Sequence, residues 1–216
     1  VNMTEDLEKY TYRGYKIEIG IDDIMGDPDL LLDDRLGTIV CLHKQYWIGD
    51  ENTDVWTVEE LEEFVEREDV LSLPLYMFDH SGITISTAPF SCPWDSGQIG
   101  HVYVTSETIQ REYEEDNEQN REIALEVMQG EIEAYDSIIR GEVFNIMIED
   151  EQGDTIDGYG GIIGDQELDE AKKEVKEIID NDIKRRWNRR ANKLKQMVNK
   201  RVPLDKRQQV LKQMEV

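Results

Sequence analysis

The segment 80–100, HSGITISTAPFSCPWDSGQIG, contains the residue types of a cysteine-dependent catalytic site. Cys92 would be the nucleophile, His80 the base that takes its proton, and Asp95 the group that orients the imidazole. The local sequence argues against this chemistry, because no basic residue adjoins Cys92 to favour the thiolate and no G-x-S-x-G elbow is present. We therefore expect a tightly turned, hydroxyl-rich loop between two strands, in which hydroxyl groups satisfy the backbone and Trp94 packs into the core.

A zinc site is the second chemistry that the residue types allow. Both cysteines and all three histidines fall in the first half of the chain. Cys41 and His43 stand two apart in a predicted strand, so they face the same side. Cys92 with either His80 or His101 would complete a tetrahedral set. The usual C-x₂-C and H-x₃-H pairs are missing, and a cysteine in a buried strand is commonly a small apolar residue, so we expect no metal and no other cofactor.

Two further motifs fail on their spacing. In the acidic segment EDEQGDTID, a calcium loop with Gly153 at its sixth position would place Ile148 at the first, where a carboxylate is required. The segment GYGGIIG misses the phosphate-binding pattern G-x-G-x-x-G because its sixth residue is Ile163. We interpret the first segment as a hairpin turn and the glycines as sites of close strand packing.

Charge is distributed unevenly along the chain. The protein carries a formal charge of −25 at pH 7. Residues 184–216 hold twelve Lys/Arg and two acidic residues, a net of +10, which leaves a net of −35 for residues 1–183. An acidic surface improves solubility and occurs in salt-adapted proteins, but self-repulsion at this density destabilises the compact state. We favour a functional acidic face, and divide the chain into an acidic α+β domain, residues 1–183, and a basic helical extension, residues 184–216.

Hydrophobic periodicity predicts an α+β fold, with a mostly antiparallel sheet, packed helices and a long C-terminal basic helix. Thr57 and Glu60 form a capping box at the start of one helix, and Gly141 is a typical residue after the end of another. We expect strands at 10–21, 36–43, 71–80 and 99–105, a hairpin at 142–164, and helices at 57–68, from 106 to the acidic break at 114–118, at 118–140 and at 166–201. The expected inner face of helix 118–140 consists of Ile123, Val127, Ile132, Tyr135 and Ile139.

The segment KRRWNRRANKLK combines a dense row of cations with an apolar helical stripe. This pattern suits phosphate contacts, a partner groove, or docking on the acidic body of a second subunit. The apolar stripe continues that of the preceding residues, which favours self-association as a homodimer anchored by Trp187. The residues assigned to self-association or nucleic-acid contact are Lys184, Arg185, Arg186, Trp187, Arg189, Arg190, Leu194 and Val198.

The segments LGTIVCLHKQYWIGDE and LPLYMFDHSGITISTAPFSCPWDSGQIGHVYVT resemble a family of uncharacterised proteins encoded by phages, plasmids and other mobile elements. The hallmark of that family is the hydroxyl-rich motif that stands here at residues 81–100. The likeness continues through IEAYDSIIRGEVFNIMIEDEQGDTID and covers roughly residues 12 to 180. The resemblance implies a mobile-element setting and supplies no catalytic residue.

Charge and resemblance together predict a non-enzymatic, phage-type protein that binds and inhibits a basic, nucleic-acid-binding host defence protein. Such a protein would be an antirestriction or anti-CRISPR protein of the DNA-mimic type, with carboxylates in the place of phosphates. The expected partner contacts are Glu59, Glu60, Glu62, Glu63, Glu66, Glu114, Glu115, Asp116, Glu149, Asp150, Glu151, Asp154 and Asp157.

Two alternatives stay open, namely a nucleic-acid-associated accessory protein that uses the basic helix and an enzyme built on Cys92, His80 and Asp95. The acidic body should repel phosphates, so we expect no direct binding to duplex DNA unless the basic segment projects beyond a Debye length of ~8 Å. No apolar run is long enough to span a membrane and the first residues contain no apolar signal region, so we expect a cytoplasmic location in the host cell.

Overall fold

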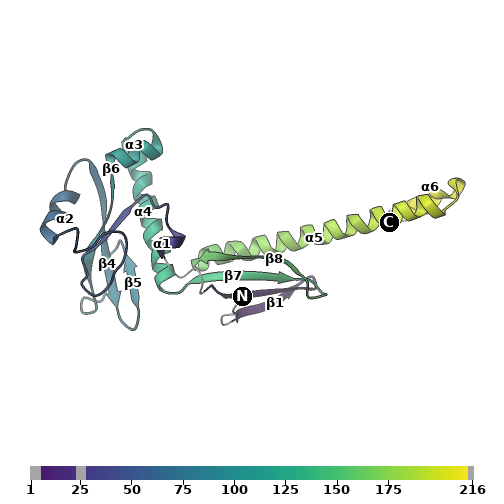
Figure 1. Ribbon diagram of the computed structural model, residues 1–216, viewed down its shortest axis with the longest axis horizontal. Coiled ribbons are helices and arrows are strands. Elements are labelled where there is room, and N and C mark those ends of the chain that lie inside the picture. The colour runs from purple at the N-terminus through teal and green to yellow at the C-terminus, as the bar shows by residue number, and fades with distance from the viewer. Residues whose placement is uncertain (1–5, 23–27, 214–216) are drawn as a thin grey trace.

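The computed structural model describes residues 6–22 and 28–213 and confirms an α+β fold with a long C-terminal helix (Figure 1). The helices are α1 Pro28–Leu31, α2 Val58–Val65, α3 Ser106–Tyr113, α4 Glu118–Ile139, α5 Gly164–Arg201 and α6 Leu204–Gln213. The strands are β1 Asp6–Tyr12, β2 Tyr15–Ile21, β3 Thr38–Cys41, β4 Val70–Asp79, β5 Ile83–Ser86, β6 Ser96–Thr105, β7 Val143–Glu149 and β8 Thr155–Ile163.

The strands are divided between two antiparallel four-stranded sheets. Sheet A has the order β1-β2-β7-β8, and sheet B has the order β3-β6-β4-β5. Sheet A joins the first two strands to the last two, so that Ile17 of β2 lies opposite Ile148 of β7. In Figure 1 the two sheets lie side by side, with α4 standing between them and leading from sheet B into β7. Both sheets fall within the predicted acidic domain, residues 1–183, which therefore contains two hydrophobic cores.

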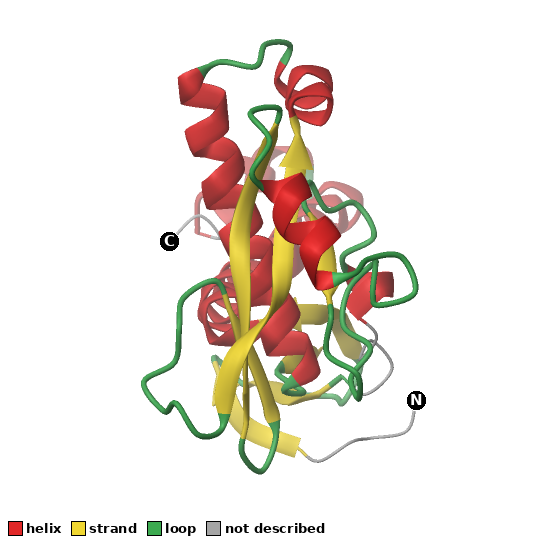
Figure 2. Cartoon of the chain, turned by 90° about the vertical axis from the view of Figure 1, so that its left-hand side faces the viewer, coloured by secondary structure: helices red, strands yellow, loops and turns green. Residues whose placement is uncertain are grey.

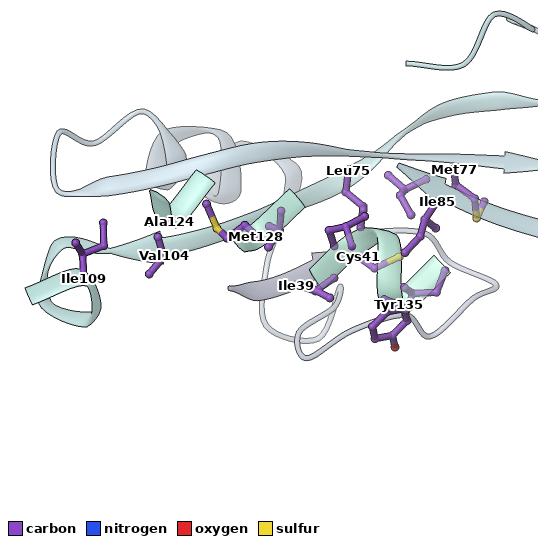
Figure 3. Packing of buried hydrophobic residues seen from close by; sticks show 14 residues of the cluster. Ile39, Cys41, Leu75, Met77, Ile85, Val104, Ile109, Ala124, Met128 and Tyr135 are labelled. Atoms are coloured by element: carbon purple, nitrogen blue, oxygen red, sulfur yellow. The ribbon is translucent and has the colours of Figure 1, made fainter. Parts of the chain in front are cut away.

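The core of sheet B lies between one face of its strands and α4 (Figure 3). Met128 and Ile132 of α4 pack against Ile39, Leu75 and other apolar strand residues. The predicted inner face of this helix is confirmed at Ile132, Tyr135 and Ile139. It was wrong at Ile123 and Val127, which are partly exposed, whereas the small Ala124 is fully buried. Helix α2 covers the opposite face of the sheet (Figure 2). On that face Phe64 meets Tyr103, with ring centroids 5.0 Å apart.

The core of sheet A lies under the first half of α5. Leu168, Val175 and Ile179 of the helix pack on the isoleucines of β2 and β7. At ~1.5 Å per residue, the 38 residues of α5 extend about 57 Å, so its second half continues past the edge of the sheet into solvent (Figure 1). The expected helix 166–201 is thus confirmed. Helix α6 follows Pro203 and lies against the end of α5. We call residues 187–213 the arm.

Local signals placed several element ends correctly. The Thr57 side chain caps α2 by accepting a hydrogen bond from the Glu60 backbone N–H. The Glu60 carboxylate in turn accepts one from the Thr57 backbone N–H, which completes the predicted capping box. Gly141 follows α4 with a φ of 75°, the left-handed conformation expected of it. The hairpin expected at 142–164 is formed by β7 and β8.

Two predicted segments differ from the structure. Residues 10–21 are not one strand, because Arg13 and Gly14 adopt positive φ angles of 51° and 87° and turn the chain into the β1-β2 hairpin. Segment 80–100 is not a single loop either. It contains β5, which pairs with β4, and the first residues of β6.

Candidate functional site

Cys92, His80 and Asp95 do come together, but in the wrong order for a nucleophile and its base. The Asp95 carboxylate stands between the other two, 3.3 Å from the His80 Nδ1 atom and 3.7 Å from the Cys92 sulfur through the same oxygen. A cysteine nucleophile needs the imidazole against its sulfur, because the imidazole must take the thiol proton. The geometry therefore does not assemble a Cys–His pair.

The five residues weighed as zinc ligands do not form a metal-binding group among the described residues. The Cys41 side chain points into the core of sheet B among apolar residues (Figure 3), and burial raises the pKa of its thiol. His101 lies opposite Val40 in the register, on the face covered by α2, with its Nε2 atom 3.5 Å from Glu62. Within residues 6–22 and 28–213, no three His, Cys, Asp or Glu side chains are grouped so that they could hold a metal ion.

Trp94 is not the core residue that we predicted. Its side chain is 91% exposed, in the connection between β5 and β6. We expect Trp94→Ala to change the free energy of unfolding by less than about 0.5 kcal/mol, because there is almost no buried surface to lose. Urea denaturation followed by circular dichroism checks this, and a loss above about 2 kcal/mol would mean that the ring is packed.

An excess of carboxylates lies on α2, on α3 and at the start of α4, at the end of the molecule opposite the arm (Figure 1). Residues 51–69 and 106–126, which we call the acidic end, hold seventeen Asp/Glu and three arginines. Each arginine already has a carboxylate partner: Arg67 pairs with Asp69, Arg111 with Glu112, and Arg121 with Asp116. Fourteen carboxylates are therefore left without a Lys or Arg counterion among the described residues.

Arg121 joins the two segments of the acidic end. Its guanidinium donates to the Glu68 carbonyl at 3.2 Å, to the Ser106 hydroxyl at 2.9 Å and to Asp116. Hydrogen bonds from Arg121 and Ser106 lower the pKa of Asp116 to about 2, against the smaller effect of its burial. The predicted contacts Glu59, Glu62 and Glu63 are exposed on α2 and Glu66 is exposed at its C-cap, and Glu114 and Glu115 are exposed directly after α3.

Two other carboxylates of α4 have structural roles. Glu131 accepts hydrogen bonds from the backbone N–H groups of Leu36 and Gly37, and Asp136 accepts one from Ile85 at 2.7 Å. Burial raises the pKa of both carboxyl groups above the ordinary values. Asp136 thereby covers part of the outer edge of β5, which would otherwise present an unpaired N–H group.

The third predicted acidic cluster, at 149–157, does not belong to the acidic end. It forms the β7-β8 turn, at the edge of sheet A next to α5. Asp150 is buried there and is not available to a partner, because it accepts hydrogen bonds from the backbone of Gln152 and Asp154 and pairs with Arg186 at 2.7 Å.

Arg186, which we assigned to intermolecular contact, is instead paired with two carboxylates of its own chain. It donates to Asp182 at 2.5 Å and to Asp150 at 2.7 Å, while the Tyr15 hydroxyl donates to Asp182 at 2.8 Å. Burial opposes ionisation of both carboxyl groups, but these hydrogen bonds outweigh it and lower the pKa of Asp150 and of Asp182. This network fixes the point at which α5 leaves sheet A.

A groove of about 690 Å³ opens beside this network, at the base of the arm. Helix α5 forms one wall with Trp187, Arg189, Arg190 and Lys193, and the two turns of sheet A form the other with Arg13 and Glu151. The second wall could not be predicted from the sequence, since no local signal relates a turn at residue 13 to a helix more than 170 residues later. Ordinary spacing rules do predict the first wall, as one face of a basic helix.

No protein-family model, curated protein or solved structure matches this chain. No helix among the described residues combines the length and the hydropathy needed to cross a bilayer. Function must therefore be inferred from the two charged surfaces themselves.

Proposed function

We propose that this is a non-enzymatic binding protein whose acidic end occupies the nucleic-acid-binding surface of a basic protein. The observation that carries the proposal is the set of fourteen carboxylates without a Lys or Arg counterion at one end of the molecule. Their mutual repulsion destabilises the fold in isolation and would be relieved when a surface rich in Lys and Arg replaces the solvent. Carboxylates would take the place of phosphates in that contact.

Apolar groups beside the carboxylates support a protein partner. Val55 and Val58, at the start of α2, are 59% and 58% exposed. Exposed apolar side chains among charges supply apolar surface that a protein partner can bury, whereas an acidic face that only improves solubility does not require them. Together with the resemblance to mobile-element proteins, this favours inhibition of a host defence protein, with antirestriction or anti-CRISPR activity as the specific form.

The test compares two charge-matched triple variants. Glu59→Lys/Glu63→Lys/Glu66→Lys reverses one face of α2, and Glu170→Lys/Glu174→Lys/Glu177→Lys makes the same change with the same spacing on the exposed side of α5. Each variant and the parent are immobilised and exposed to the heparin-binding proteins of a bacterial host lysate. We expect the parent and the α5 variant to capture the same protein and the α2 variant to lose it by at least about tenfold, since close charge pairs contribute strongly to binding.

Two further observations decide the proposal. Duplex DNA should compete with capture, and about 0.5 M salt should release the partner, because both act on the same charged surface. Equal losses in the two variants would show that capture follows total charge and would contradict the proposal. A captured protein that stays bound in the presence of excess duplex DNA would also contradict the proposal.

A further inference from the structure

The arm carries a stripe of cations that the acidic end does not explain. Arg189, Arg190, Lys193, Lys200 and Arg201 recur at spacings of three, four and seven residues, which places them on one side of α5. All five are exposed, and none pairs with a carboxylate of the described residues. The stripe begins in the groove at the base of the arm and runs away from sheet A. It therefore offers a row of fixed positive charges to an extended anion.

An aromatic ring stands at the start of this row. Trp187 lines the groove and is 67% exposed, one residue after the Arg186 side chain that is fixed by Asp150 and Asp182. An exposed indole beside free guanidinium groups is the combination that binds single-stranded nucleic acids, in which bases stack on the ring and phosphates contact the cations. A base inside a duplex has no free face for such stacking.

Distance separates the outer part of the stripe from the acidic body. From Trp187 to the end of α5 the arm extends about 22 Å, at ~1.5 Å per residue. The Debye length at physiological salt is only ~8 Å, so the field of the body is largely screened at the outer cations. In Figure 1 the acidic end lies at the other extreme of the molecule. The outer part of the arm thus projects beyond a Debye length from the body, which is the condition under which the chain could bind a nucleic acid despite its net charge.

We propose that the groove and the basic stripe of α5 bind single-stranded nucleic acid. The backbone follows the cations from Arg189 to Arg201, and one unpaired base stacks on Trp187. Arg186 is a positioning residue that holds the base of the arm against sheet A. This inference does not depend on the function proposed for the acidic end, which lies elsewhere in the molecule and would contact protein.

Fluorescence anisotropy of a labelled oligothymidine of about 20 nucleotides, added to the full chain at low salt, tests the site. With five cations and ~0.7 released counterions per contact, the slope of log K against log salt should be about −3.5. Arg190→Glu/Lys193→Glu should weaken binding at least about tenfold. Trp187→Ala should weaken it about tenfold, and Trp187→Phe should restore most of the affinity because a phenyl ring also stacks.

The matched control is Lys184→Glu/Lys195→Glu, which makes the same change of charge on the other side of α5 and should bind nearly as the parent does. Equal losses in the two double variants would overturn the proposal, because binding would then follow net charge. Unchanged binding by Trp187→Ala would overturn it as well. Tighter binding to a duplex of the same length, or equal competition by polyglutamate, would assign the stripe to a duplex or to an acidic protein. A second copy of this chain is such a protein, and light scattering would reveal that assembly.

Discussion

Replacing Gly100 by alanine is expected to destabilise sheet B strongly. Gly100 lies opposite Cys41, and a Cβ atom added to it would stand 1.9 Å from the Val40 carbonyl oxygen and 2.9 Å from the Val40 carbonyl carbon. Both contacts are with backbone atoms, so neither can be relieved by rotating a side chain. Strands β3 and β6 would have to separate where the Leu42 N–H donates to the Ile99 carbonyl at 2.7 Å.

We expect Gly100→Ala to lower the free energy of unfolding by about 3 kcal/mol or more, as for a severe overpacking in a core. Gly97→Ala is the matched control, because it lies three residues earlier in β6 and its added Cβ atom would meet nothing within 4 Å. Its stability should be unchanged or higher by up to about 1 kcal/mol. Urea denaturation monitored by circular dichroism compares the two, and equal stabilities would contradict the close approach of β3 and β6.

Asp182→Asn should produce the second large loss, of about 2–4 kcal/mol at pH 7, because it removes the charge from a buried group that binds both Tyr15 and Arg186. Asp180→Asn is the control on the same helix. Asp180 pairs with Arg13 at 3.3 Å, but both side chains are about half exposed, and such pairs contribute little.

The loss should depend on pH. Since the pKa of Asp182 in the folded protein is below its ordinary value of 3.8, the ionised carboxylate stabilises the fold at pH values above 3.8. That stability is lost as the pH falls through the lowered pKa. The difference between Asp182→Asn and the parent should therefore be constant from pH 5 to 7 and shrink towards pH 2. Thermal unfolding at several pH values measures it, and a difference that stays the same in acid would exclude the proposed role of the charge.

Those parts of the fold that depend on neighbouring residues could be predicted from the sequence. The capping box at Thr57, the β7-β8 hairpin and the full length of α5 each follow from signals within a short window. The division into two sheets could not be predicted, because it depends on the pairing of β2 with β7, more than 120 residues apart. The β1-β2 turn was missed because Arg13, a residue with no preference for positive φ, occupies it.

The candidate site was predictable only in part. The acidic segments and the basic stripe could be located by counting charged residues. Counting could not predict that Arg121 joins two of the acidic segments, or that the third borders the arm. The assignment of Trp94 to the core was wrong because a large aromatic residue in a stretch with few charges is normally buried. Similarly, Asp150 and Arg186 look like surface charges in the sequence and are fixed in one internal network.

The separation of charge along the molecule gives it a large electric dipole moment. Carboxylates gather beyond α2 and α3 at one extreme, and cations line the arm at the other (Figure 1). A charged body that approaches exerts a torque on such a molecule before any atoms touch, so a polycation is met by the α2 end and a polyanion by the arm. The molecule would then be oriented before contact, so that each end meets ligands of the opposite charge. This effect would be strongest at low ionic strength.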